Sequence, residues 1–213
     1  MKKGFIFDLD GVIADTAKFH YIAWKALASQ LGIEIDEVFN EQLKGISRLD
    51  SLERILEHGN KTGQFSVAEK EAFAERKNTH YVELLQNLSP ADILPGVKTF
   101  LEKAHKLGIP CAIASASKNA PFILEKLQLI DYFIVIIDPA TLTKGKPDPE
   151  IFLKACEALN IEPQDAVGFE DAQAGIAGIK KAGMLAVGVE SNESLAAADI
   201  CVQQLDTLDI NSL

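Results

Sequence analysis

Short apolar segments alternate with segments of helical spacing over most of the second half of the chain. The apolar segments predict strands at residues 109–114, 133–137, 166–169, 185–189 and 200–202. Helices are predicted between them, at residues 95–107, 121–129 and 148–159 and after Asp171. Such alternation is typical of a parallel sheet covered by helices, because parallel strands need long crossover connections. The chain is therefore predicted to be an α/β protein with a doubly wound, Rossmann-like parallel sheet.

The chain begins with the same kind of strand, which ends in two carboxylates. Residues 4–7 are a continuous apolar run, typical of a strand buried on both faces, and Asp8-Leu9-Asp10-Gly11 follows. Ligands of open α/β sheets bind at the carboxyl ends of the strands. An ionised Asp8 can act as a nucleophile and form an aspartyl-phosphate, and Asp10 can act as general acid and base if its pKa is higher. Taken alone, the segment fits an Asx-turn with Gly11 at positive φ equally well.

A helical block separates this first strand from the remaining strands. Residues 16–31 have apolar side chains at helical spacing, and no strand pattern occurs before about Leu88. Ser47 and Ser66 each start a capping-box pattern, so each is predicted to begin a helix. We expect residues 16–88 to form an all-helical cap domain inserted into a catalytic core of residues 1–15 and 89–213. A cap on two adjacent linkers can open and close as a lid.

Composition excludes several classes of protein. The 213 residues carry a formal net charge of −10 without a basic run, so nucleic acid and anionic membranes are poor partners. No apolar run reaches transmembrane length, and Asp8 and Asp10 interrupt the first apolar stretch too early for a secretion signal. The widely separated Cys111, Cys156 and Cys201 fit small, buried, reduced residues better than disulfides or a zinc site. We expect a cytoplasmic protein that acts as a monomer.

Polar groups follow four of the predicted strands, namely Asp8 with Asp10, Ser115, Lys146, and Glu170 with Asp171. Each group has a structural alternative. Ser115 or Asn119 could cap a helix, Lys146 could be a solvated loop charge, and the acidic pair could complement a helix dipole. Lys144 could also replace Lys146, although the Lys-Pro pair favours Lys146. A shared site is the better interpretation of all four groups together, because parallel strand ends face one crevice.

The chemistry that these groups fit is phosphoryl transfer. A carboxylate that attacks a phosphate is opposed by a repulsion of about 4 kcal/mol per pair of unit charges at about 4 Å near a protein surface. Asp8 and Asp171 could hold Mg²⁺, with Glu170 orienting them, and Lys146 would add a positive charge. Candidate donors to the phosphate oxygens are the Ser115 hydroxyl and the backbone amides of Leu9, Asp10 and Ala116.

These four groups resemble the four motifs of the haloacid dehalogenase superfamily. The residues that carry the resemblance are Asp8-Leu9-Asp10-Gly11-Val12, Ser115, Lys146-Pro147 and Glu170-Asp171. Asp10 favours the phosphotransferases of that superfamily over its dehalogenases, which need neither a second, proton-transferring Asp nor a metal. The resemblance extends to the β-phosphoglucomutase family over nearly the whole chain. It is carried there by residues 20–27, 40–48, 76–78 and 115–122. The superfamily motifs specify a mechanism, and the stretches in the cap point to the mutase.

The resemblance implies interconversion of β-glucose 1-phosphate and glucose 6-phosphate through β-glucose 1,6-bisphosphate. Asp8 would be phosphorylated and Asp10 would move protons. Mg²⁺ would be held by Asp8, the Asp10 carbonyl and Asp171, with Glu170 beside them. The sugar and its non-transferring phosphate would contact His20, Trp24, Gly45, Ser47, Arg48, Lys77, Ser117, Lys118 and Asn119, and Thr16 would lie at the hinge.

Other interpretations remain open at this stage. Without the resemblance, the spacing predicts that His20 and Lys77 are exposed helix residues and that Arg48 is a helix-surface charge. A sugar-phosphate phosphatase of the same superfamily would use the same Asp8 and Asp10 with water as acceptor. A signalling receiver also combines acidic strand ends, Mg²⁺, a Ser or Thr and a Lys, but the helical insert and the Asp-x-Asp spacing argue against it.

Overall fold

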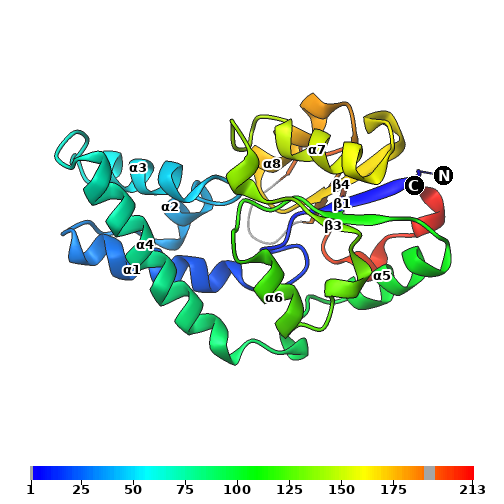
Figure 1. Ribbon diagram of the computed structural model, residues 1–213, viewed down its shortest axis with the longest axis horizontal. Coiled ribbons are helices and arrows are strands. Elements are labelled where there is room, and N and C mark those ends of the chain that lie inside the picture. Colours follow the sequence, from blue (N-terminus) through cyan, green and yellow to red (C-terminus); the bar gives the residue numbers. More distant parts are fainter. Residues whose placement is uncertain (1, 190–194) are drawn as a thin grey trace.

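The computed structural model describes residues 2–189 and 195–213, and these form a parallel sheet in the order β3-β2-β1-β4-β5-β6 (Figure 1). The strands are β1 (Gly4–Phe7), β2 (Cys111–Ile113), β3 (Val135–Ile136), β4 (Ala166–Glu170), β5 (Leu185–Val189) and β6 (Ile200–Val202). Every neighbouring pair is parallel. The predicted doubly wound α/β fold is confirmed.

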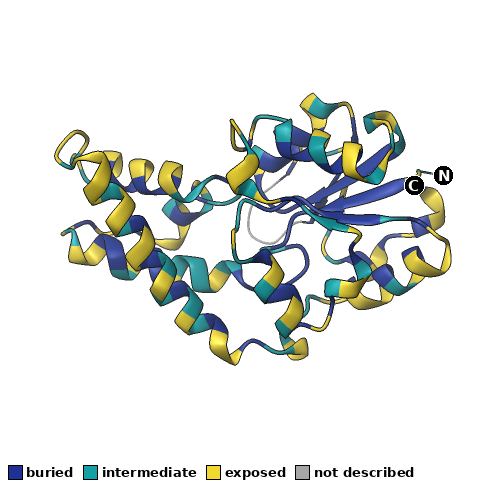
Figure 2. Ribbon diagram, viewed as in Figure 1, coloured by how far each residue is buried: buried dark blue, intermediate teal, exposed yellow. Residues whose placement is uncertain are grey.

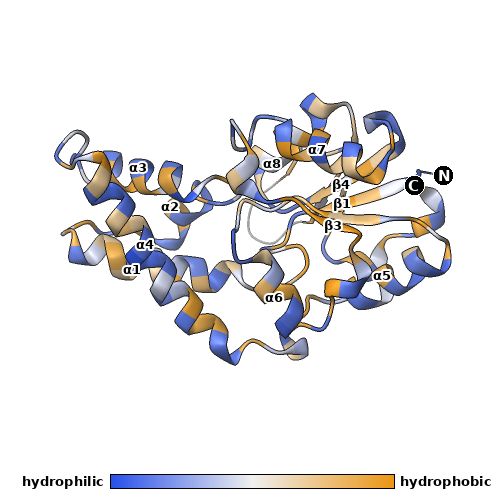
Figure 3. Ribbon diagram, viewed as in Figure 1, coloured by the Kyte–Doolittle hydropathy of each residue, from blue (hydrophilic) through white to orange (hydrophobic). Residues whose placement is uncertain are grey.

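Alternate residues of β1 pack against helices on opposite faces of the sheet. Phe5 and Phe7 join the core cluster that includes α5 (Val97–Lys106) and α6 (Ala120–Lys126). Ile6 instead joins the cluster built from α7 (Glu150–Leu159) and α8 (Gln173–Ala182). Because the side-chain period of a strand is two, a strand covered on both faces is apolar throughout. Figures 2 and 3 show the resulting buried and apolar sheet between its two helical layers.

The helices that follow β1 form a separate unit, the helical insert, beyond the carboxyl ends of the strands (Figure 1). It contains α1 (Ala17–Gln30), α2 (Glu37–Glu41), α3 (Arg48–His58) and α4 (Val67–Leu84), and a short turn of 3₁₀ helix follows at Leu85–Asn87. The insert has its own apolar core, in which Trp24, Leu27, Leu52 and Ile55 are buried. The absence of a strand from this part of the chain agrees with the sequence, whereas the domain limits at 16 and 88 stay a prediction.

Local signals predicted two helix starts correctly and two others with small errors. The Ser47 hydroxyl accepts a hydrogen bond from the Asp50 amide at 3.1 Å, and Ser66 forms a full capping box with Glu69. By contrast, α5 begins after Gly96 rather than at residue 95, and α7 begins after Pro149 rather than at residue 148. A proline's fixed φ suits the position before a helix as well as the first turn.

The two linkers between the insert and the sheet are hydrogen-bonded to each other. The Leu94 amide donates to the Ile13 carbonyl at 3.0 Å, and the Asp15 amide donates to the Asp92 carbonyl at 3.2 Å. The chain therefore leaves and rejoins the sheet through one narrow paired strip. Such a connection concentrates backbone rotation in few residues, as a lid requires.

The cysteines follow the sequence prediction except at the sheet edge. Cys111 and Cys156 are buried, and burial raises the pKa of these thiols to about 12 and about 11. Cys201 is exposed, contrary to the prediction, because β6 is the edge strand. No disulfide links the three. In the described part of the chain, no helix is both long and apolar enough to cross a membrane.

Candidate active site

The strand ends that the sequence singled out meet at the centre of the sheet. β1 and β4 are neighbours there, and Phe7 pairs in register with Phe169, so Asp8 lies beside Glu170. The Asp8 amide donates to the Phe169 carbonyl at 2.9 Å. Ser115 follows β2, the other neighbour of β1. This point is where the strand order reverses, which is where open α/β sheets bind their ligands.

Lys146 is buried between two carboxylates. Its Nζ lies 2.6 Å from Asp8 Oδ1 and 2.6 Å from Glu170 Oε1, and its side chain is 1% exposed. Burial alone would lower the pKa of this ammonium, but the two carboxylates outweigh burial and raise it. Lys144 is exposed, with its Nζ 3.9 Å from Asp148. The interpretation of Lys146 as a solvated loop charge is therefore wrong, and Lys144 does not take its place.

Three buried carboxylates lie close enough to share a metal ion. Single oxygens of Asp8, Glu170 and Asp171 all lie within 4.8 Å of one another. Burial raises the pKa of Asp8 to about 7, and burial with the neighbouring Glu170 charge raises the pKa of Asp171 well above its usual range. Burial is the largest cause of both shifts, and the neighbouring carboxylates add to it. A hard divalent cation fits these oxygen donors and would reverse both shifts.

Two glycines leave room for these carboxylates. Gly11 has φ +81°, and a Cβ there would overlap the Asp171 carboxylate. A Cβ on Gly175, inside α8, would overlap the Glu170 carboxylate. Glycine at position 175 therefore allows the Glu170 carboxylate to pack directly against α8. The turn with Gly11 at positive φ also exists, and it places an acidic site rather than merely ending a strand.

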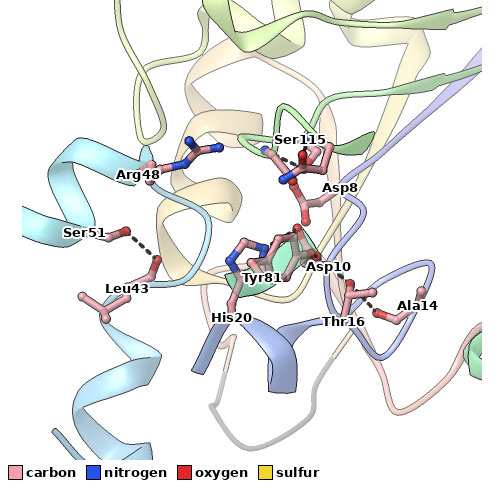
Figure 4. Close-up of polar contacts among 12 residues, drawn as sticks. Asp8, Asp10, Ala14, Thr16, His20, Leu43, Arg48, Ser51, Tyr81 and Ser115 are labelled. Atoms are coloured by element: carbon pink, nitrogen blue, oxygen red, sulfur yellow. Dashed lines mark hydrogen bonds and ion pairs between the residues drawn. The ribbon is translucent and has the colours of Figure 1, made fainter. Parts of the chain in front are cut away.

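Asp10 is held by side chains that lie on or next to the helical insert (Figure 4). Thr16 Oγ1 donates to Asp10 Oδ1 at 2.5 Å, Tyr81 Oη donates to the same oxygen at 3.2 Å, and His20 Nε2 lies 3.5 Å from Oδ2. Burial alone would raise the pKa of Asp10, but His20 and the two hydroxyls outweigh it and lower this pKa to about 2. The condition named from the sequence, a higher pKa for Asp10, is therefore not met in this arrangement. Asp10 is ionised and can accept a proton.

His20 and Lys77 lie inside the site, so the interpretation of both as exposed helix residues is wrong. Lys77 Nζ lies 2.7 Å from His20 Nδ1 and only 4.8 and 4.7 Å from the ring centroids of Trp24 and Tyr81. Burial, reinforced by the Arg48 charge, lowers the pKa of Lys77 to about 7. Burial and the Lys77 charge also lower the pKa of His20. Both residues lie where α1 and α4 face each other, which spacing along one helix does not show.

A cleft between the helical insert and the sheet collects most of the predicted binding residues. Its wall includes Asp8, Asp10, His20, Trp24, Gly45, Arg48, Lys77, Ser115, Ala116, Ser117, Asn119 and Asp171. Thr16, Lys146, Glu170 and Leu9 are buried behind this wall. Ser47 and Lys118 do not line the cleft, because Ser47 caps α3 and Lys118 is exposed. Within the described residues, the amides of Asp10 and Ala116 have no acceptor, so both are available to a ligand.

Arg48 enters the cleft from the start of α3, so it is more than a helix-surface charge. Figure 4 shows its side chain extending toward the side of the cleft where Ser115 and Asp8 lie. Arg48 Nη2 donates to Asn78 Oδ1 at 2.8 Å, and Nη1 lies 3.3 Å from the exposed carboxylate of Glu75.

Sequence reasoning missed three residues of the site, of which Asn78 and Lys44 line the cleft and Tyr81 is buried behind it. Tyr81 lies four residues after Lys77 on α4, so helical spacing could have placed it on the same face. Asn78 lies within the stretch 76–78 that carries part of the resemblance. Lys44, whose Nζ lies 2.7 Å from Glu41 and 3.5 Å from Asp171, had no local signal that separates it from a solvated loop lysine.

Known proteins resemble this chain over nearly its full length. Residues 2–183 match the haloacid dehalogenase-like hydrolase family. A β-phosphoglucomutase of Bacillus subtilis (strain 168) is 48% identical over 211 residues, covering 99% of this chain and 93% of that protein. A validoxylamine A 7'-phosphate phosphatase of Streptomyces hygroscopicus subsp. limoneus is 30% identical, covering 96% of this chain and 95% of that protein.

A solved structure agrees with the sequence matches. The crystal structure of β-phosphoglucomutase from Clostridium difficile superposes with a TM-score of 0.96 at 47% identity, covering 100% of this chain and 95% of that one. The similarity thus includes both the sheet that carries the acidic cluster and the helical insert that closes the cleft. The chain belongs to the haloacid dehalogenase-like hydrolase family and, within it, to the β-phosphoglucomutases.

Proposed function

We propose that the protein is a Mg²⁺-dependent phosphomutase that interconverts β-D-glucose 1-phosphate and glucose 6-phosphate. The observation that carries the proposal is a cleft to which both units contribute groups suited to phosphate. The sheet contributes the acidic cluster, Lys146 and Ser115, and the helical insert contributes the Arg48 guanidinium. A bisphosphate intermediate needs two such groups at once. The 48% identity to a β-phosphoglucomutase supports the choice of sugar.

Asp8 is the proposed nucleophile. Lys146 binds Asp8 Oδ1, which leaves Oδ2 to attack phosphorus. Asp8, the Asp10 carbonyl and Asp171 would hold Mg²⁺, with Glu170 beside them, and the bound ion would offset the repulsion between carboxylate and phosphate. Donors to the oxygens of the transferring phosphate would be the Ser115 hydroxyl, the Lys146 ammonium and the amides of Leu9, Asp10 and Ala116.

Asp10 is the proposed proton carrier. In its ionised form it accepts the proton of the sugar hydroxyl that attacks phospho-Asp8, and β-glucose 1,6-bisphosphate forms. After the bisphosphate reorients, its other phosphoryl group passes to Asp8. Asp10 then returns the proton to the sugar oxygen that leaves. Thr16, Tyr81 and His20 keep the Asp10 carboxylate oriented between these two transfers.

The helical insert is proposed to select the acceptor. Arg48, Ser117 and Asn119 would hold the phosphate that is not transferred, and this remote contact would favour a closed cleft, from which bulk water is excluded. His20, Trp24, Gly45 and Lys77 would contact the sugar from the insert. Ser47 and Lys118 would contact the ligand from the edge of the cleft. Thr16 would serve as the hinge, because Thr16 lies where the linker meets α1.

A phosphatase is the second candidate function. The phosphatase from Streptomyces hygroscopicus matches 96% of this chain at 30% identity, so a related sequence accompanies a different activity in that protein. In that case water would attack phospho-Asp8, and Asp10 would accept a proton from water instead of from a sugar. The residues at the strand ends serve both reactions equally, so only the fate of the phosphoryl group separates them.

The experiment that tests the proposal is a primed mutase assay. Purified protein is given Mg²⁺, β-glucose 1-phosphate and a catalytic amount of β-glucose 1,6-bisphosphate, and glucose 6-phosphate is measured with a coupled dehydrogenase. We expect steady conversion, no conversion of the α-anomer, and none by the Asp8→Asn variant, which cannot be phosphorylated. Mass spectrometry should find phosphate on Asp8 of the wild type. Phosphate on another residue, or no glucose 6-phosphate, would overturn the proposal.

The location and the assembly state are part of the same proposal. We infer a cytoplasmic protein from the three cysteines, since none of them forms a disulfide. We infer a monomer, because one chain supplies every group that the proposed reaction uses. Size-exclusion chromatography with light scattering checks the monomer, and a dimer that forms at assay concentrations would contradict it.

A further inference from the structure

Asn78 joins side chains that reach the cleft from different elements. Its Oδ1 accepts one hydrogen bond from Arg48 Nη2 at 2.8 Å and another from Asn119 Nδ2 at 2.9 Å. Asn78 lies on α4, Arg48 begins α3, and Asn119 precedes α6 on the sheet side of the cleft. A single amide oxygen therefore connects the helical insert to the sheet side of the cleft.

The orientation of these amides follows from the chemistry of arginine. A guanidinium has only donors, so the Asn78 atom that faces Arg48 must be the oxygen. The Asn119 atom that faces the same oxygen must then be its NH₂ group, which keeps a second N–H. The guanidinium also has more N–H groups than its two partners engage. Donors from both residues therefore remain for an anionic ligand, and both residues line the cleft.

Asn78 also holds Arg48 without cancelling its charge. An amide oxygen fixes a guanidinium by hydrogen bonding and carries no net charge, whereas a carboxylate in its place would neutralise the cation. The carboxylate that does approach Arg48 belongs to Glu75, whose side chain is 70% exposed, so solvent screens that pair. Arg48 is thus ordered and still able to attract a phosphate.

We propose that Asn78 is the positioning residue that presents Arg48 and Asn119 together to the non-transferring phosphate of the sugar. The inference rests on the proposed function, because it takes from that proposal the roles of these two residues. Its bond to Asn119 crosses the cleft, so it forms when the insert lies against the sheet. Without Asn78, both side chains would become ordered only when the ligand binds. The free-energy cost of ordering them would then weaken binding.

The test compares the binding of a ligand with two phosphates among variants that cannot turn it over. In an Asp8→Asn background with Mg²⁺, calorimetry measures the Kd of β-glucose 1,6-bisphosphate. We expect Asn78→Ala to raise this Kd about tenfold, as expected for two side chains that lose their order. Asn78→Asp should raise it more, because a carboxylate neutralises Arg48 and repels the phosphate. The matched control is Asn87→Ala, since Asn87 is exposed and lies outside the cleft.

Two further measurements separate positioning from a general structural role. In an Arg48→Ala background, Asn78→Ala should raise the Kd by a smaller factor than it does in the presence of Arg48. The reason is that one of the two side chains that Asn78 positions is already absent. With Asp8 intact, hydrolysis of acetyl phosphate, which needs only the groups that hold the transferring phosphate, should stay within about twofold of the wild type in Asn78→Ala.

Three results would each overturn the inference. The first is an unchanged bisphosphate Kd in Asn78→Ala, and the second is an equal rise in Kd from Asn78→Ala with and without Arg48. The third is a loss of acetyl phosphate hydrolysis as large as the loss of bisphosphate affinity. These outcomes do not depend on mutase turnover. If the bisphosphate Kd rises as expected and no glucose 6-phosphate is made, the proposed function fails and the positioning role stands.

Discussion

At the scale of single residues, two aspartates two positions apart have pKa values shifted in opposite directions. Burial among other carboxylates raises the pKa of Asp8 to about 7, whereas His20 and two hydroxyls lower the pKa of Asp10 to about 2. Environments that separate two titratable groups in this way separate their roles. Asp8 needs the charge of a bound cation to stay ionised for attack, whereas the donors around Asp10 already keep it ionised.

The role of Asp10 gives the first prediction. In Asp10→Asn, kcat should fall by about 10²–10⁴-fold, as is usual when a general acid and base is lost. The affinity for Mg²⁺ should change little, because only the backbone carbonyl of residue 10 would contact the ion. Steady-state kinetics and a metal titration measure the two quantities. A variant whose kcat lies within a few-fold of the wild-type value would remove Asp10 from the proton transfer.

At the scale of elements, the ends of β1 and β4 bring together the carboxylates that fit a metal. This arrangement predicts that EDTA abolishes turnover and that added Mg²⁺ restores it. Asp171→Asn should weaken Mg²⁺ binding but leave the melting temperature of the metal-free protein nearly unchanged. The pKa of Asp171 is raised in the metal-free site, so its negative charge adds little to the stability of the fold. Calorimetry with Mg²⁺ alone, together with thermal melting, checks both. Full turnover after complete metal removal would contradict the site.

How much could be predicted from the sequence also differs between elements. The strands, the strand-end residues Asp8 and Lys146, and the helix start at Ser66 could be predicted, because each rests on a signal within a few residues. The placement of Lys77 could not, since it depends on how α4 packs against α1 rather than on spacing within α4. The low pKa of Asp10 was also out of reach, because its donors include Tyr81, which is 71 residues away.

At the scale of the whole molecule, the protein has two packed units joined by one strip of paired linkers, and the cleft between them needs residues from both. Arg48 is a cation that the insert contributes to the cleft, and its side chain extends toward the side where Ser115 and Asp8 lie. Arg48→Ala should lower mutase flux by at least about tenfold, equivalent to about 1.4 kcal/mol at the transition state. Hydrolysis of the phosphoenzyme should fall much less, because water carries no second phosphate to hold.

Rapid-quench measurements of phosphoenzyme decay, with and without sugar phosphate, supply the two rates for Arg48→Ala. Arg54→Ala is the matched control, since Arg54 is an exposed arginine on the same helix and does not line the cleft. If Arg48→Ala slows transfer to sugar and transfer to water by the same factor, then Arg48 does not select the acceptor, and the lid argument fails.

The most direct test of the account is where the phosphoryl group on Asp8 goes in the wild-type protein. Glucose 6-phosphate and free phosphate are measured together, in one reaction, from β-glucose 1-phosphate with Mg²⁺ and a trace of β-glucose 1,6-bisphosphate. The account predicts that glucose 6-phosphate accumulates far faster than free phosphate, because the closed cleft admits a sugar hydroxyl and excludes bulk water. Free phosphate released faster than glucose 6-phosphate would contradict it and make the protein a phosphatase.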